Sequence, residues 1–125
     1  MFATLPLVAL GGAIGASLRH LLGAAALRVF GPGFPWGTLI VNLTGCLVMG
    51  IAATLIADKA APRLAPLLIT GLLGGFTTYS AFALDAVSLW QRGATGPALG
   101  YILATTAGSL AAVVLGMTIA RAVTA

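Results

Sequence analysis

Small and hydroxyl-bearing residues interrupt an apolar stretch that reads GLLGGFTTYSAFALD, residues 71–85. Glycine and β-branched threonine both weaken a helix, so the segment 74–78 predicts a break without any proline. The first half should end near Leu73–Gly74, and the second should begin near Thr78–Tyr79. Carbonyl groups freed there would suit a small monovalent cation, because no acidic residue lies nearby to balance a divalent one. The alternative is an unbroken helix whose threonines bond back to carbonyls of the preceding turn.

Two aromatic residues follow this segment at helical spacing. Tyr79 and Phe82 are three positions apart and therefore share one helix face. An aromatic ring has a positive edge, which favours a small anion that has lost its water. Hydroxyl and amide groups, such as those of Asn42 and Ser109, would supply the remaining donors. Ordinary core packing is the alternative for the two rings, and Asn42 must either bond a neighbouring helix or line a wet path.

Titratable residues are too few for most enzymes. The chain has one histidine, one cysteine and only two acids, Asp58 and Asp85. This excludes a carboxylate pair buried in one helix and almost any metalloenzyme, so the chain is not expected to be an enzyme. A single thiol forms neither an intrachain disulfide nor a metal cluster, and Cys46 is interpreted as a packing residue.

The composition is that of an integral membrane protein. Of 125 residues, 60% are hydrophobic and 6% are charged, whereas a soluble domain needs about 25% charged residues. Four stretches reach the roughly 20 apolar residues that span a bilayer. The sequence predicts an all-α fold, with one membrane domain over 1–125 and spans at about 3–27, 34–57, 64–89 and 94–120. The interruption then lies close to the bilayer midplane.

The basic residues do not favour one orientation in the membrane. Four spans put Lys59, Arg63 and Arg121 on one side and Arg19, Arg28 and Arg92 on the other. Orientation normally follows an excess of Lys and Arg on the cytoplasmic side. The balance predicts insertion in both directions and pairing as an antiparallel, dual-topology homodimer, unless a small asymmetry decides the orientation. The net charge of +4 is explained by helix ends in a lipid bilayer, and no nucleic acid is expected as a partner.

Three segments resemble the signatures of the Fluc/CrcB fluoride channel family. They are GGAIGASLRH at 11–20, GTLIVNLTG at 37–45 and GLLGGFTTYSAF at 71–82. Their order and spacing and the chain length match, so the resemblance covers essentially the whole sequence. It implies a passive, fluoride-selective channel of the bacterial inner (plasma) membrane that exports fluoride from the cytoplasm. It also implies an antiparallel dimer with two anion pores and a structural Na⁺ at its centre.

The resemblance assigns roles to individual residues. Backbone carbonyls of Gly74 and Thr77 would bind the Na⁺. The residues it places along the anion pathway are Asn42, Tyr79, Ser80, Phe82, Thr105, Ser109 and Arg19, the last at an aqueous vestibule. The chain departs from the family at Tyr79, where phenylalanine is usual, and at Ala81, where a hydroxyl residue is usual.

Two other function classes make different predictions. A proton-coupled exporter of the small multidrug type also has four short helices, but it needs a carboxylate within the membrane. The chain has no Glu, and Asp58 and Asp85 lie at or near span ends. The other class is a non-transporting assembly protein, whose polar residues only join helices and which would carry no ion flux.

Overall fold

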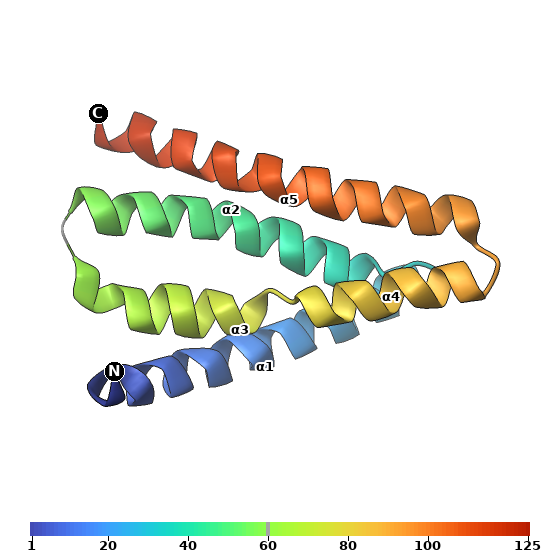
Figure 1. Cartoon of the computed structure of the whole chain (residues 1–125), viewed down its shortest axis with the longest axis horizontal. Helices are drawn as coiled ribbons and strands as arrows, with labels where there is room; N and C mark the ends of the chain where they lie inside the picture. Colours follow the sequence, from blue (N-terminus) through green and yellow to red (C-terminus); the bar gives the residue numbers. More distant parts are fainter. Residues whose placement is uncertain (60) are drawn as a thin grey trace.

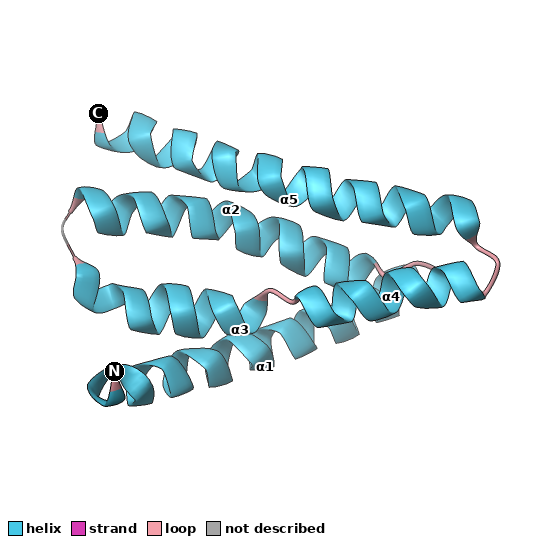
Figure 2. Ribbon diagram, in the orientation of Figure 1, coloured by secondary structure: helices cyan, strands magenta, loops and turns pink. Residues whose placement is uncertain are grey.

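The computed structural model describes residues 1–59 and 61–125, and in these ranges the chain consists of helices and short connections (Figures 1 and 2). Four helical stretches, at Phe2–Phe30, Trp36–Asp58, Pro62–Gln91 and Thr95–Thr124, are long and apolar enough to cross a membrane. The protein is therefore an all-helical, multi-pass membrane protein. The elements are η1 (Phe2–Thr4), α1 (Leu5–Phe30), α2 (Trp36–Asp58), η2 (Pro62–Leu64), η3 (Pro66–Leu73), α3 (Gly74–Phe76), α4 (Tyr79–Gln91) and α5 (Thr95–Thr124).

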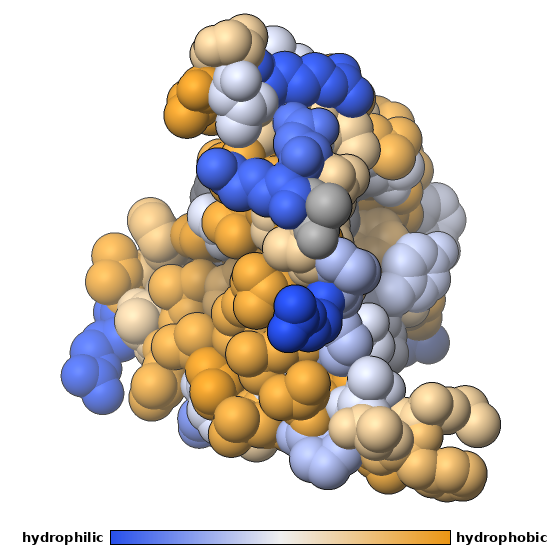
Figure 3. Space-filling view, turned by 90° about the vertical axis from the view of Figure 1, so that its left-hand side faces the viewer, coloured by the Kyte–Doolittle hydropathy of each residue, from blue (hydrophilic) through white to orange (hydrophobic). Residues whose placement is uncertain are grey.

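The helices run back and forth, so both termini, the end of α2 and the start of η2 lie at one end of the molecule (Figure 1). Hydrophilic side chains gather at this end, and apolar side chains cover much of the surface beside them (Figure 3). At the opposite end the chain turns at Gly31 and Gly93, where φ is 80° and 81°. A residue with a Cβ rarely adopts that backbone conformation, so glycine suits both turns.

The helices pack mainly in two pairs. α2 lies along α5, and α1 lies along η3 and α3. Glycines allow the second pair to approach closely: a Cβ on Gly11 would overlap the Leu67 carbonyl oxygen, and one on Gly15 would overlap that of Leu72. Small residues serve this purpose at helix interfaces in membranes. Gly11 and Gly15, four positions apart, thus form a packing face of α1.

The third span is not one continuous helix. Its first part, η3, has π-helical hydrogen bonding and leads into the short α3, which ends at Phe76. Thr77 and Thr78 are extended, with φ and ψ of −78° and 155° and of −149° and 124°. Tyr79 then begins α4. The first half therefore ends two to three residues later than the sequence indicated, because Gly75 stays helical and packs against the backbone of Gly12 on α1.

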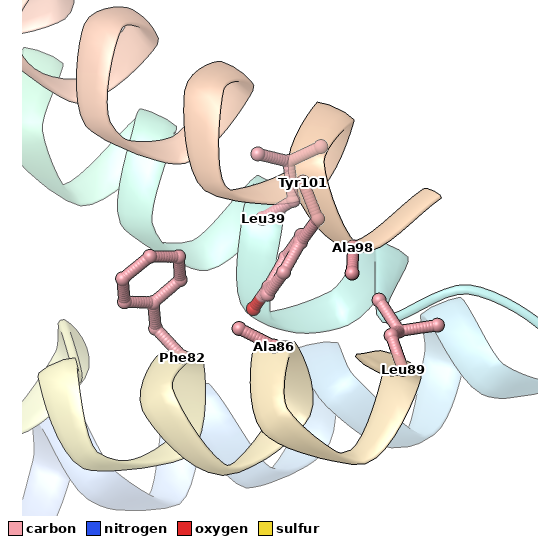
Figure 4. Close-up of a cluster of buried hydrophobic side chains, with 6 residues drawn as sticks. All are labelled: Leu39, Phe82, Ala86, Leu89, Ala98 and Tyr101. Carbon is pink, nitrogen blue, oxygen red and sulfur yellow. The ribbon is translucent and has the colours of Figure 1, made fainter. Parts of the chain in front are cut away.

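A buried cluster joins α2, α4 and α5 near the end opposite the termini (Figure 4). Tyr101 from α5 is fully buried and points between Phe82 and Ala86 of α4, while Leu89 is 1% exposed. This cluster fixes the position of α4 relative to the other two helices. The ring of Phe82 is therefore held against α5 at the side of the interruption.

Candidate functional site

A cavity of about 360 Å³ lies beside the interruption, between α2, the start of α4 and α5. Five of the residues predicted along the anion pathway line it, namely Asn42, Tyr79, Phe82, Thr105 and Ser109, as does Thr77 from the predicted Na⁺ site. The other lining residues are Cys46, Thr78, Thr106 and Leu110. Residues from three spans, far apart in the sequence, thus surround one space. No Lys, Arg, Asp or Glu is among these lining residues.

Asn42 joins α2 to the interrupted backbone through two hydrogen bonds. Its side-chain NH₂ donates to the Thr78 carbonyl at 2.9 Å, and its Oδ1 accepts from the Thr78 N–H at 2.8 Å. Asn42 is only 6% exposed, so both partners satisfy each other away from water. Of the two roles open to this amide, the structure shows the bond to a neighbouring segment, and the same side chain also borders the cavity.

Two carbonyl groups at the interruption lose their helical donors. In a continuing α-helix the Thr78 N–H would pair with the Gly74 carbonyl, and the Ala81 N–H with that of Thr77. The Thr78 N–H instead donates to Asn42, and the Ala81 N–H donates to Thr78 Oγ1 at 3.2 Å. Thr78 is thereby the side-chain N-cap of α4. The oxygens of Gly74 and Thr77 lack these helical partners, and Gly74 is exposed on this chain.

Arg19 approaches the same helix end from α1. Its Nε donates to the Gly75 carbonyl at 3.2 Å. A cation at the carbonyl end of a helix is stabilised by the helix dipole. Arg19 is not among the residues that line the 360 Å³ cavity, and the structure places it at the end of α3.

The rings at the cavity continue into a longer aromatic series. The centroids of Tyr79 and Phe82 are 5.6 Å apart with an edge-to-face angle of 71°, and those of Phe82 and Tyr101 are 5.3 Å apart. The Tyr101 ring lies 5.5 Å from that of Phe34. An aromatic ring has a negative face and a positive edge, so in an edge-to-face pair the edge of one ring meets the face of the other. Phe82 is 8% exposed, whereas Tyr79 is 81% exposed on the single chain.

Two residues of α5 that line the cavity have buried hydroxyls without partners in the described part of the chain. Thr105 Oγ1 and Ser109 Oγ are both buried and have no hydrogen-bond partner among the described residues. They lie one helical turn apart, so they form a short row along one face. A buried hydroxyl that lacks a partner is destabilising, and such groups call for a ligand or water. Ser80 is exposed, and it lies outside the lining with its hydroxyl 3.4 Å from that of Thr78.

A second hollow of about 480 Å³ opens at the end of the molecule opposite the termini, and both Asp85 and Arg92 line it. The Tyr101 hydroxyl donates to Asp85 Oδ2 at 3.2 Å, which links this hollow to the aromatic series. Tyr101 was not among the residues chosen from the sequence. The signal was present, because Tyr101, Thr105 and Ser109 recur every four residues and so share a face of α5.

The site therefore combines unpaired hydroxyls, an amide and ring edges in a space lined by neutral residues. Such groups can replace the water around a small ion without fixing a compensating full charge nearby. Together with four helices long and apolar enough to span a membrane, this arrangement defines a multi-pass membrane protein with an uncharged, partly polar cavity between its helices.

Comparison with known proteins identifies the family. The family model described as "CrcB-like protein, Camphor Resistance (CrcB)" matches residues 6–117, and the chain belongs to this family. A Paracoccus denitrificans protein named "Fluoride-specific ion channel FluC" is 54% identical over 114 residues, which cover 91% of each chain. A protein of the same name from Rhizobium etli is 56% identical over 93% of this chain and 94% of its own. A third, from Cereibacter sphaeroides, is 50% identical over 97% of both.

These comparisons confirm the family resemblance that the three sequence signatures indicated. The relatives are named as ion channels, which also confirms that the chain is not an enzyme.

Proposed function

We propose that the protein is a passive, fluoride-selective channel that exports fluoride from the cytoplasm across the inner (plasma) membrane and so lowers its toxicity. The observation that carries the proposal is the cavity beside Thr77 and Thr78. There the unpaired hydroxyls of Thr105 and Ser109 lie in one space with Phe82 and Asn42. Relatives that match nearly the whole chain are named for fluoride conduction.

Fluoride makes a particular demand on such a site. It is small and holds its water strongly, so a selective path must replace that water at close range. Hydroxyl donors and the positive edges of aromatic rings meet this demand, since neither carries a full charge that would trap the ion. Tyr79, Phe82, Thr105 and Ser109 supply these groups on the anion pathway. Arg19 and Ser80 belong to the approaches, because they lie beside the cavity lining rather than in it.

A second copy of the chain completes this proposal. The single chain exposes 7539 Å², whereas a compact soluble protein of its mass would expose about 6,100 Å². Tyr79 is 81% exposed although it borders the cavity. This exposure leaves a face that a second copy can cover, and the balance of Lys and Arg in the sequence favours an antiparallel homodimer. Such a dimer contains two equivalent anion pathways, one beside each copy of the interruption.

Na⁺ is the proposed structural ion at the centre of this dimer. The interruption lies near the bilayer midplane, where two antiparallel copies would cross. The Gly74 and Thr77 carbonyls fit the role because their usual helical donors are engaged elsewhere. No group of three His, Cys, Asp or Glu side chains that could hold a metal occurs in residues 1–59 and 61–125. Carbonyl oxygens from both copies would replace the water of this hard cation.

Fluoride release from liposomes tests the function. Purified protein is reconstituted into vesicles loaded with potassium fluoride, valinomycin carries the compensating potassium, and an electrode follows the released fluoride. We expect rapid release that depends on the protein, with little release of chloride from vesicles loaded with potassium chloride. Chloride release as fast as fluoride release would contradict selectivity. The absence of any flux would favour a non-transporting assembly protein.

A further inference from the structure

Cys46 occupies a different environment from the packing position expected from the sequence. It lies one helical turn after Asn42 on α2 and lines the 360 Å³ cavity together with Phe82 and Thr105. The thiol is free and partly exposed. It is also the only cysteine in the chain. Any reagent that requires a thiol therefore has one target, within the space assigned to the anion.

A second observation concerns the polar groups beside this cavity. Thr105 lines the same cavity and is 6% exposed, and its buried hydroxyl has no hydrogen-bond partner among the described residues. Ser109, one turn further along α5, has a second unpaired hydroxyl. A ligand on Cys46 would thus meet oxygen donors on the opposite helix.

We propose that Cys46 is an inhibitory binding site for soft, thiol-binding metal ions, for which Hg²⁺ is the probe. Thiolate is the protein ligand that such ions prefer. The S–H bond of Cys46 breaks, an S–Hg bond forms and the proton passes to water, so no oxidant or reductant is needed. The product is a thiolate-bound mercuric ion with a net charge of +1, coordinated further by water or by the Thr105 hydroxyl.

The bound metal obstructs conduction in two ways. It occupies space beside Phe82, where the path is bordered by a buried ring. It also places a positive charge among residues that are otherwise neutral, and an anion that pairs with this charge is held there. Fluoride flux is therefore lost when Cys46 is occupied. This inference rests on the proposed channel function.

The test compares fluoride efflux with and without external Hg²⁺ for each of four proteins, each measured against its own untreated rate. These are the natural chain, Cys46→Ser, Cys46→Ala, and Cys46→Ser combined with Val48→Cys. Val48 is on the same helix but lines an apolar groove on another side, and it is 47% exposed. Mass spectrometry of the recovered protein reports whether mercury is attached. Addition of 2-mercaptoethanol then removes it.

We expect Hg²⁺ to abolish flux through the natural chain, and 2-mercaptoethanol to restore it. The two thiol-free variants should retain their own untreated rate, and the Val48→Cys chain should bind mercury without losing flux. Persistent flux through a natural chain that carries mercury would overturn the proposal, as would failure of mercury to bind. Equal inhibition of the thiol-free variants would also overturn it. Absence of flux before any treatment would instead count against the channel function itself.

Discussion

Asn42 acts as a substitute peptide group. It donates to the Thr78 carbonyl and accepts from the Thr78 N–H, as a neighbouring backbone would. The sequence identified this residue because an amide in mid-membrane must find partners. It could not identify the partner, because Thr78 is 36 positions away and the pairing depends on how α2 crosses the third span.

Replacement of Asn42 by leucine should destabilise the protein. Both backbone groups of Thr78 would lose their partner in a partly buried setting, where the cost is at most about 1–3 kcal/mol for each group. Thermal unfolding in detergent, followed by loss of the folded species on size-exclusion chromatography, measures the effect. Thr44→Val is the matched control on the same helix, since its hydroxyl bonds only to carbonyls of its own helix. Equal stability of Asn42→Leu and the control would show that the amide pair is dispensable.

Phe82 is the residue whose replacement should most affect conduction. Its ring is 8% exposed and lies between Tyr79 and Tyr101. Isoleucine fills much of the same volume but has no ring edge, so Phe82→Ile should nearly abolish fluoride efflux from liposomes while the protein still folds. Phe2→Ile, at an 80% exposed position outside the site, is the control. A rate equal to that of the control would remove Phe82 from the pathway.

The third span shows which features of a helix could be predicted from the sequence and which could not. Gly74, Gly75 and the threonines predicted an interruption, and two extended residues lie there. The sequence did not distinguish what the glycines contribute from what the threonines contribute. Gly75 serves close packing against Gly12 on α1, while Thr77 and Thr78 form the extended part. Helix propensity treats both residue types as helix-weakening, and only the position of α1 distinguishes their roles.

The packing of α1 against η3 can be tested with one methyl group. A Cβ on Gly15 would overlap the Leu72 carbonyl oxygen, and overpacking of this kind costs about 1–3 kcal/mol. Gly15→Ala should therefore lower the thermal stability in detergent. Gly12→Ala is the control on the same helix, because nothing lies within 4 Å of a Cβ there. A Gly15→Ala protein as stable as Gly12→Ala would refute the close approach.

At the scale of the whole molecule, composition predicted the class and the number of spans, because both depend on transfer from water to lipid. The relative placement of the spans was not predictable. Lipid solvates apolar side chains as well as other helices do, so hydropathy does not encode which helix faces which. The spacing of Tyr101, Thr105 and Ser109 indicates a shared face of α5 but not which helix that face meets, and Tyr101 was missed. Its role depends on α5 meeting α4, and α5 is apolar around most of its circumference.

Dual topology is a prediction about whole molecules rather than residues. Both termini lie at one end of the chain (Figure 1). Lys59, Arg63 and Arg121 lie toward that end, Arg28 and Arg92 toward the other, and Arg19 lies within α1 beside the interruption, so neither end has a large excess of basic residues. A reporter fused after Ala125 should therefore be found on both sides of the membrane. Paired fusions to alkaline phosphatase and to a fluorescent protein measure this distribution, since each is active on only one side. Activity of just one of the two fusions would show a single orientation.

The two extended residues also have a mechanical consequence. α1 packs on η3 and α3 before them, whereas α4 packs on α5 after them. Thr77 and Thr78 therefore connect a part packed on α1 to a part packed on α5, and Asn42 holds this connection through its two hydrogen bonds to Thr78. A displacement of one part relative to the other would change the backbone torsions of these two residues. Because the ψ torsion of Thr77 orients its carbonyl, the packing on both sides of the interruption together determines where that oxygen points.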